Sequence, residues 1–229
     1  HCNIKGALMH FEGQNIAIIG GGESGVGAAI LANKMGANVF VSDAGLLKEN
    51  YKSELQQLNV EYEESGHDLD RILKANLVIK SPGIPNTAAV IQSCNVNSVN
   101  VISEIEFAAK FTKAKKICIT GSNGKTTTTM LVYHIFKNAG IEVSFAGNVG
   151  KSFARQVASI EPAYFIIELS SFQLDDIQDF RADISILLNI TPDHLDRYEN
   201  NLSLYADSKM RITKNQSASD WFIYNADDQ

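Results

Sequence analysis

The chain has 229 residues and a formal net charge of −6 at pH 7, and its 45% hydrophobic and 20% charged residues are typical of a globular protein with one large domain or two ordinary ones. The acidic balance excludes a general affinity for nucleic acid, and no apolar run or leader pattern indicates a membrane span or secretion. The three cysteines, Cys2, Cys94 and Cys118, follow no metal-binding or disulfide spacing, so we expect a cytoplasmic protein with reduced thiols.

The first predicted elements surround a glycine-rich loop. Residues 1–8 precede Met9 and are expected to be an extension without structure. A strand over 15–20 then runs into Gly20-Gly21-Gly22-Glu23-Ser24-Gly25, followed by an Ala-rich helix with Gly36 as its C-cap. A strand over 38–42 ends at Asp43, about 20 residues after the glycines, which is the spacing of a dinucleotide-binding unit. A glycine turn that only packs a helix on a strand is the alternative.

The alternation of strands and helices continues to residue 111. Strands are predicted over 60–62, 77–80 and 99–102, and helices over 47–58, 88–94 and 104–111, with Asp68 capping a further short helix that ends at Leu73. This order predicts a parallel, doubly wound α/β sheet. The strand over 77–80 ends in Ser81-Pro82-Gly83, a turn where such sheets place ligand loops, although it can also be a rigid connection.

A polar link over 112–116 separates this half from a second glycine loop. An apolar strand breaks into Thr120-Gly121-Ser122-Asn123-Gly124-Lys125-Thr126-Thr127, and a helix then runs to about residue 139 and is closed by Gly140. Backbone N–H groups of such a loop face a phosphate, the lysine reaches the β- and γ-phosphates, and the first threonine hydroxyl binds magnesium. The loop is shorter than usual, since Ile119 stands where a glycine is expected. A structural turn with a chance Gly-Lys-Thr is the alternative.

Later strands end in polar groups. Strands are predicted over 142–146, 164–169, 184–190 and 221–224, and helices up to residue 159 and over 202–213. Because parallel strands share one carboxyl edge, we expect Glu168 and the segment Asp193–Asp196 to converge on the phosphate loop. An acid in that place commonly serves magnesium, although Glu168 can instead be a solvated acid. For His194 a metal-ligand role and a surface role both remain open.

Several segments together resemble the Mur ligases of peptidoglycan synthesis. They are residues 120–127, 147–150 (Gly-Asn-Val-Gly), 168–174 (Glu-Leu-Ser-Ser-Phe-Gln-Leu), 189–198, 81–83 and 225–228. The family consists of ATP-dependent amide ligases with three domains. The resemblance therefore implies a Rossmann-like UDP-substrate-binding domain over residues 1–112, followed by an incomplete P-loop ATPase-type α/β domain over residues 113–229. It also implies that the chain is a truncated, inactive fragment and a monomer.

The resemblance also implies site residues. ATP is expected at Gly121, Ser122, Asn123, Gly124, Lys125, Thr126 and Thr127. The UDP substrate is expected at Glu23, Ser24, Gly25, Asp43, Ser81, Gly83, Asn148 and His194. Two Mg²⁺ ions are expected at Thr126, Glu168, His194 and Lys209, with Lys209 carbamylated and with Lys125, His194 and Lys209 in catalytic roles. Gly45 stands where relatives often carry a basic residue.

The implied reaction is an activation followed by a capture. ATP phosphorylates the alanyl carboxylate of UDP-N-acetylmuramoyl-L-alanine, and the amine of D-glutamate attacks the acyl phosphate. Two binding functions remain open beside this ligase: a nicotinamide-binding module at the first glycine loop, and a nucleotide-binding fragment without ligase activity.

Overall fold

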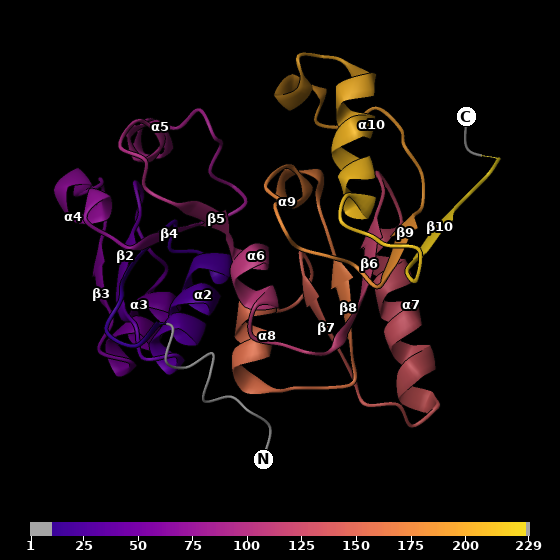
Figure 1. The fold of residues 1–229 in the computed structure, drawn as a ribbon, viewed down its shortest axis with the longest axis horizontal. Coiled ribbons are helices and arrows are strands. Elements are labelled where there is room, and N and C mark those ends of the chain that lie inside the picture. The colour runs from indigo at the N-terminus through magenta and orange to yellow at the C-terminus, as the bar shows by residue number, and fades with distance from the viewer. Residues whose placement is uncertain (1–10, 228–229) are drawn as a thin grey trace. The chain divides into compact units, whose positions relative to one another are not determined.

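The computed structural model describes residues 11–227, so the expectations for residues 1–8, Cys2 and Asp228 lie outside the described residues. The chain forms two compact units (Figure 1). The first contains the chain up to Phe111 together with Ser152–Ser159. The second contains Thr112–Lys151 and the chain from Ile160 onward.

The first unit is built on a five-stranded sheet in the order β3-β2-β1-β4-β5, with every pair parallel. Its strands are β1 (Asn15–Ile19), β2 (Asn38–Ser42), β3 (Glu61–Glu63), β4 (Leu77–Lys80) and β5 (Val101–Ser103). Its helices are α2 (Glu23–Lys34), α3 (Glu49–Gln57), α4 (Leu69–Leu73), α5 (Ala89–Val96) and α6 (Glu104–Ala109). The predicted doubly wound sheet is confirmed. The strand order reverses between β1 and β4, so the glycine loop and the Ser81 turn leave adjacent strands.

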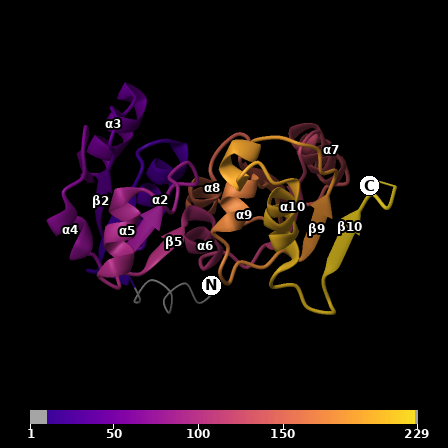
Figure 2. The same cartoon turned by 90° about the horizontal axis from the view of Figure 1, so that it is seen from above.

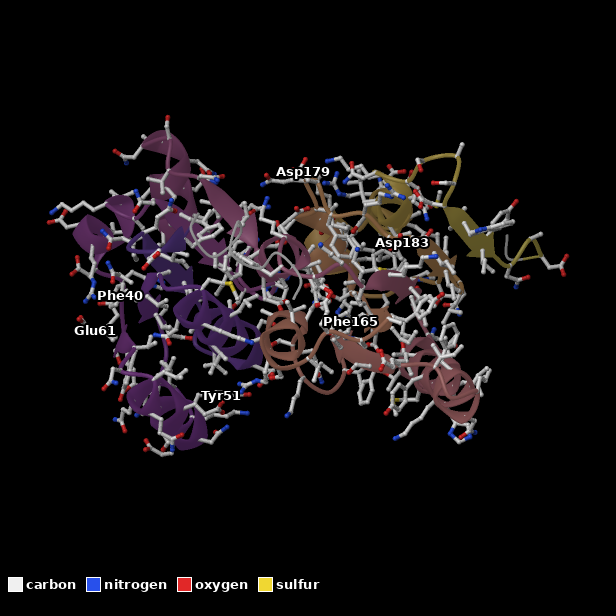
Figure 3. The ribbon with its side chains drawn as sticks, turned by 60° about the horizontal axis from the view of Figure 1, so that its bottom comes forward. Phe40, Tyr51, Glu61, Phe165, Asp179 and Asp183 are labelled. Carbon is white, nitrogen blue, oxygen red and sulfur yellow. The ribbon has the colours of Figure 1, made fainter. Side chains whose placement is uncertain are left out.

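The core of this unit follows the alternation of side chains along the strands. Ala17, Ile19 and Phe40 point to one face of the sheet, where they meet apolar side chains of α4 and α5. Phe40, which is labelled in Figure 3, is a residue of β2. The two predicted helix ends are also confirmed: the Asp68 side chain accepts the N–H of Arg71, and Gly36, at φ +81°, follows the end of α2.

Helix α8 (Phe153–Ser159) belongs to the first unit although the chain on both sides of it belongs to the second. It packs against α2 and α6. A glycine at position 27 makes this approach possible, because a Cβ there would lie 2.0 Å from Ser152 Oγ. The Lys34 ammonium donates to the carbonyl of Ala158 at 2.5 Å.

The second unit has another five-stranded parallel sheet, in the order β10-β9-β6-β8-β7 (Figure 1). Figure 2 shows β10 beside β9 at one edge of this sheet. Its strands are β6 (Lys115–Thr120), β7 (Val143–Gly147), β8 (Tyr164–Glu168), β9 (Ile184–Leu187) and β10 (Trp221–Tyr224). Its helices are α7 (Lys125–Asn138), α9 (Ser171–Asp175) and α10 (Leu202–Met210), with 3₁₀ turns η1 (Leu195–Tyr198) and η2 (Arg211–Thr213). Strand β6 lies between β8 and β9, so the loops that follow these three strands meet at one edge.

Two local expectations need correction. The strand predicted over 184–190 ends at Leu187, because the chain then turns so that the Asn189 side chain hydrogen-bonds the phosphate loop. Helix α9 was not predicted, yet the Ser170 hydroxyl and the Gln173 side chain form a complete capping box at its start. Its five residues are too few for a helical period to be visible in the sequence.

Candidate functional site

The phosphate loop between β6 and α7 depends on two glycines. Gly124, at φ +81°, precedes the first turn of α7, and Gly121 has φ +155°. A Cβ on Gly121 would lie 3.0 Å from the Cβ of Leu188 and 3.3 Å from the backbone nitrogen of Asn189, so a side chain there would be tightly packed as well as strained by φ. The Lys125 ammonium folds back over the loop and donates to the carbonyls of Gly121 and Ser122 at 2.9 and 2.8 Å.

Glu168, at the end of β8, accepts hydrogen bonds from a side chain in the first turn of α7 and from one in the loop after β7. Thr126 Oγ1 donates to its Oε2 at 2.7 Å and Asn148 Nδ2 donates to its Oε1 at 2.9 Å. The Glu168 side chain is buried, with 1% of the residue exposed. A buried carboxylate beside a threonine hydroxyl is a pair of oxygen donors of the kind that Mg²⁺ uses together with phosphate and water.

Lys209, on α10, lies against the other side of the phosphate loop. Its ammonium donates to the Gly121 carbonyl at 2.9 Å and lies 4.3 Å from the centre of the Tyr205 ring. Burial, and then the charge of Lys125, lowers the pKa of Lys209 to about 8. At a pH slightly above 7, a substantial fraction of this amine is therefore already neutral and hence nucleophilic.

His194 stands apart from these groups in an exposed loop. It has φ +49° and precedes η1, its Nε2 lies 3.7 Å from an Asp193 carboxylate oxygen, and 58% of its side chain is exposed. Within residues 11–227 no group of three or more histidine, cysteine, aspartate or glutamate side chains is arranged to hold a metal. Of the four predicted magnesium ligands, Thr126 and Glu168 contact each other. Lys209 contacts the Gly121 carbonyl instead, and among the described residues no hydrogen bond joins His194 to the other three.

Three side chains that the sequence analysis did not select also contact the phosphate loop. Asn189 and Thr191 follow β9, and Tyr205 lies on α10. The polar run after the strand predicted over 184–190 was the available signal for Thr191, whereas Asn189 lay inside that predicted strand. Tyr205 carries no local signal, because it reaches Ser122 only through the packing of α10.

In the first unit, the glycine loop is closed by hydrogen bonds to the ends of β2 and β4. The Asp43 carboxylate accepts the N–H groups of Gly21 at 2.6 Å and Gly45 at 2.8 Å. Ser81 Oγ donates to the Gly20 carbonyl at 3.2 Å. Gly25 allows the helix to start close to the strand, because a Cβ there would lie 1.7 Å from the Gly20 oxygen. Asp43, Ser81 and Gly25 are therefore brought together at this loop.

The side chain of Glu23 is committed to helix α8. Its carboxylate accepts the N–H of Ser152 at 3.0 Å and two guanidinium N–H groups of Arg155 at 2.8 and 3.1 Å, and Arg155 also pairs with Glu54. The backbone N–H groups in the first turn of α2, and not the Glu23 carboxylate, are then available to meet an anion there. At Gly83, by contrast, an added Cβ would meet nothing within 4 Å.

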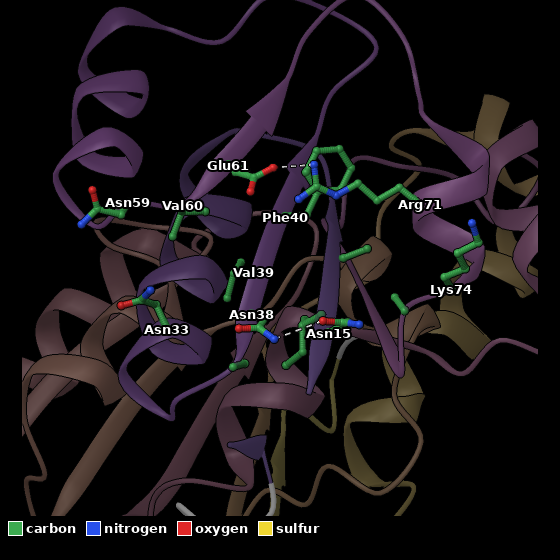
Figure 4. A pocket seen from close by; sticks show the side chains of 14 residues that line it. Asn15, Asn33, Asn38, Val39, Phe40, Asn59, Val60, Glu61, Arg71 and Lys74 are labelled. Atoms are coloured by element: carbon green, nitrogen blue, oxygen red, sulfur yellow. Dashed lines mark hydrogen bonds and ion pairs between the residues drawn. The ribbon is translucent and has the colours of Figure 1, made fainter. Parts of the chain in front are cut away.

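A cavity of about 500 Å³ lies elsewhere in the first unit, at the amino-terminal ends of β1 and β2 (Figure 4). Asparagine amides and the Arg71–Glu61 ion pair line it, and Arg71 stacks on the ring of Phe40 at 3.8 Å. None of the predicted site residues lines this cavity. It lies at the opposite end of the strands from the glycine loop.

The described helices of residues 11–227 include none that is long and apolar enough to cross a membrane.

Comparison with known proteins gives matches along most of the chain. The Mur ligase middle domain matches residues 119–229, and the MurD N-terminal domain matches residues 15–90. The UDP-N-acetylmuramoylalanine–D-glutamate ligases of Porphyromonas gingivalis and Bacteroides fragilis are 56% and 54% identical over 214 and 215 residues. These alignments cover 93% and 94% of this chain but 48% of each relative, so the chain spans about half the length of the curated relatives it matches.

Solved structures share the fold at low sequence identity. The UDP-N-acetylmuramate:L-alanyl-gamma-D-glutamyl-meso-diaminopimelate ligase of Neisseria meningitides matches with a TM-score of 0.67 at 19% identity, covering 95% of this chain and 72% of its own. The UDP-N-acetylmuramate-alanine ligase MurC of Thermotoga maritima matches with a TM-score of 0.61 at 22% identity, covering 94% of this chain and 50% of its own.

Proposed function

Because the chain belongs to the Mur ligase family, we propose that it is part of an ATP-dependent ligase that joins D-glutamate to UDP-N-acetylmuramoyl-L-alanine. The observation that carries this proposal is the meeting of three loops at one edge of the second sheet. A phosphate loop, the Thr126–Glu168 pair and the segment from Asn189 to His194 follow adjacent parallel strands. The relatives at 54–56% identity supply the identity of the substrates.

The two parts of the chain take different ligands in this proposal. Residues 1–112 form the UDP-substrate domain and residues 113–229 the ATP domain, although α8 of the latter range belongs to the first compact unit. The diphosphate of the substrate meets the N–H groups at the start of α2, with Asp43, Ser81 and Gly83 near the uridine. Gly83 supports this assignment, because neither the space around it nor a positive φ requires a glycine there. A ligand that approaches the backbone closely is a sufficient reason for it.

In the second unit, the N–H groups at the start of α7 and the ammonium of Lys125 hold the ATP phosphates. Lys125 now donates to two loop carbonyls, so it exchanges those partners for phosphate oxygens. Thr126 and Glu168 would hold one Mg²⁺. Carbamylated Lys209, with Asn148 and His194, would complete the second ion site and the contacts to the substrate. Bound Mg²⁺ would neutralise part of the negative charge of the phosphates.

The proposed reaction transfers the γ-phosphoryl group of ATP to the alanyl carboxylate. The nitrogen of D-glutamate then attacks the carbonyl carbon of the acyl phosphate, an amide bond forms, and phosphate leaves. Lys125 is placed to oppose the negative charge on the transferring oxygens. The protein acts as a monomer in the cytoplasm in this proposal.

The first test is calorimetry of the 229-residue chain with three ligands in parallel. UDP-N-acetylmuramoyl-L-alanine and Mg·ATP should bind, and NADH should not. Saturable NADH binding without a signal from the UDP ligand would replace the ligase proposal with a nicotinamide-binding one.

A matched pair of variants tests the magnesium assignment. Thr126→Val removes the hydroxyl that contacts Glu168, and Thr128→Val makes the same change two residues further along α7. The first variant should lose most of the dependence of ATP affinity on Mg²⁺, and the second should keep it. Equal Mg²⁺ dependence in both would remove Thr126 from the proposed ion site.

Turnover separates binding from catalysis. Orienting two reactants can lower a barrier by roughly 7–11 kcal/mol, and in the proposal part of that orientation comes from the half of the relatives' length that this chain does not span. We therefore expect ligand binding without turnover. Phosphate release with ATP, Mg²⁺ and both substrates, with the product checked by mass, tests this; a rate near about 10 per second would show that these residues suffice.

A further inference from the structure

The side chain of Asn189 holds the first half of the phosphate loop by hydrogen bonds to Ser122 and Asn123, a set of bonds that we call the bracket. Its Oδ1 accepts the backbone N–H groups of Ser122 at 3.1 Å and Asn123 at 2.9 Å, and its Nδ2 donates to the carbonyl of Asn123 at 3.1 Å. The Ser122 N–H also lies 3.0 Å from the backbone carbonyl of Asn189. One carboxamide therefore uses its acceptor and its donor on the same two-residue segment of the loop.

A second set of bonds joins the same segment to Thr191. Ser122 Oγ donates to the Thr191 carbonyl at 2.8 Å and accepts the Thr191 N–H at 2.9 Å. The Asn123 amide donates to Thr191 Oγ1 at 3.1 Å. The loop after β9 and the phosphate loop are thus held together along their length, and the former leads within three residues to His194.

The glycine at position 121 shows how closely the two loops approach. A Cβ added there would lie 3.0 Å from the Leu188 side chain and 3.3 Å from the Asn189 nitrogen, and the Leu188 N–H donates to the Thr120 carbonyl at 3.0 Å. Glycine and short polar residues leave a loop many conformations, and each residue that must be ordered opposes ligand binding. A loop that is already ordered binds phosphate without that cost.

We propose that Asn189 is a positioning residue that orders the phosphate loop for the ATP phosphates and, with Thr191, couples this loop to the one that carries His194. This inference rests on the proposed function. The Asn189 side chain accepts the backbone N–H groups of Ser122 and Asn123. The backbone N–H groups at the start of α7, together with the Lys125 ammonium, then remain to bind phosphate. Because it contacts the loop and not the reacting atoms, its effect should appear in phosphate affinity.

The test compares Asn189→Ala with a matched control. The Asn215 side chain also hydrogen-bonds a distant backbone segment of the same unit, since its Nδ2 donates to the carbonyls of Gln178 and Phe180. Asn215→Ala therefore loses side-chain hydrogen bonds to the backbone away from the phosphate loop. Calorimetry of the 229-residue chain with Mg·ATP, magnesium tripolyphosphate and adenosine should show both phosphate ligands weakened about tenfold in Asn189→Ala, equal to about 1.4 kcal/mol. Adenosine affinity and the Asn215→Ala variant should be unaffected.

Hydrogen exchange supplies a second measurement that a general loss of stability would not reproduce. The amides of Ser122 and Asn123 should exchange faster in Asn189→Ala, and those of the 178–180 segment should not. Should Asn189→Ala fail to fold, Asn189→Asp keeps the acceptor oxygen but loses the donor to Asn123. Because its added negative charge itself opposes phosphate binding, a loosening of the loop is then read from hydrogen exchange of the residues around Asn123, and unchanged exchange there would overturn the positioning role.

Each outcome decides between the proposals. Unchanged phosphate affinity in Asn189→Ala, with Mg·ATP binding to the unaltered chain, would overturn the positioning role and leave the proposed function standing. Tighter phosphate binding would also overturn it, because the carboxamide would then be a competitor for the N–H groups that phosphate needs. A failure of the unaltered chain to bind Mg·ATP or tripolyphosphate would overturn the proposed function itself.

Discussion

Replacement of Glu104 by glutamine should make the stability of the first unit less sensitive to pH. Glu104 begins α6 with 1% of the residue exposed, and its Oε1 accepts the N–H of Ala154 at 2.5 Å. Its Oε2 has no hydrogen-bond partner among the described residues. Burial, only partly offset by the bond from Ala154, raises the pKa of this carboxyl from 4.5 to about 7, and the charge of Glu23 adds to the rise.

The sign and size of the effect follow from this shift. An acid with a raised pKa in the folded state favours folding while it is protonated, so its contribution is complete below pH 4.5 and is lost as pH rises through about 7. Each pKa unit corresponds to about 1.4 kcal/mol, so between pH 5 and pH 8 the unfolding free energy of the unaltered unit should fall by about 2.5 kcal/mol relative to Glu104→Gln.

Two buried thiols allow the two units to be followed separately. Cys94 lies in the core of the first unit and Cys118 on β6 of the second. Equilibrium urea titrations can be read by a short pulse of a thiol-reactive reagent, with the labelled peptides identified by mass spectrometry. The Cys94 transition should carry the pH-dependent difference between the two proteins, and the Cys118 transition serves as the internal control. A difference of the same size at pH 5 and pH 8 would refute the link between Glu104 ionisation and folding.

Three further changes test other parts of the structure. Lys125→Ala should weaken Mg·ATP binding at least about tenfold, since a charge-assisted hydrogen bond contributes about 1.5–3 kcal/mol. Calorimetry measures the Kd, with Lys137→Ala, near the other end of α7, as the control. An unchanged Kd in Lys125→Ala would mean that Lys125 has a purely structural role. Gly27→Ala should lower the unfolding free energy of the first unit by about 1–3 kcal/mol because its Cβ would overlap the start of α8. Gly66→Ala is the control and should not lower the unfolding free energy, because an added Cβ there would meet nothing within 4 Å. Equal urea transitions for the two variants would disprove the close approach of α8 to Gly27. In NMR spectra recorded with carbon-13 bicarbonate, a carbamate signal of Lys209 should grow as pH rises through about 8, where the neutral amine becomes abundant. The Lys209→Met variant should lack this signal. A signal that persists in the variant would place the carbamate on another amine.

Local chemistry explains which features could be predicted from the sequence. A phosphate loop needs glycines at fixed places, and Gly121 and Gly124 have the positive φ angles that this requires. Alternating strands and helices indicate parallel sheets, and parallel strands place their carboxyl ends on one edge. The convergence of Glu168 on the phosphate loop was therefore expected, and the hydrogen bond to Thr126 confirms the convergence. The roles of these residues in binding remain predictions.

The tertiary structure alone decided the environment of each group. The bracket from Asn189 joins residues 66 positions apart along the chain, and Lys209 reaches the Gly121 carbonyl across 88. The raised pKa of Glu104 and the lowered pKa of Lys209 arise from burial, which depends on every segment that packs around them. The sequence shows that an acid or an amine is present. Whether it is charged, and what it contacts, is determined by which distant segments exclude water from it.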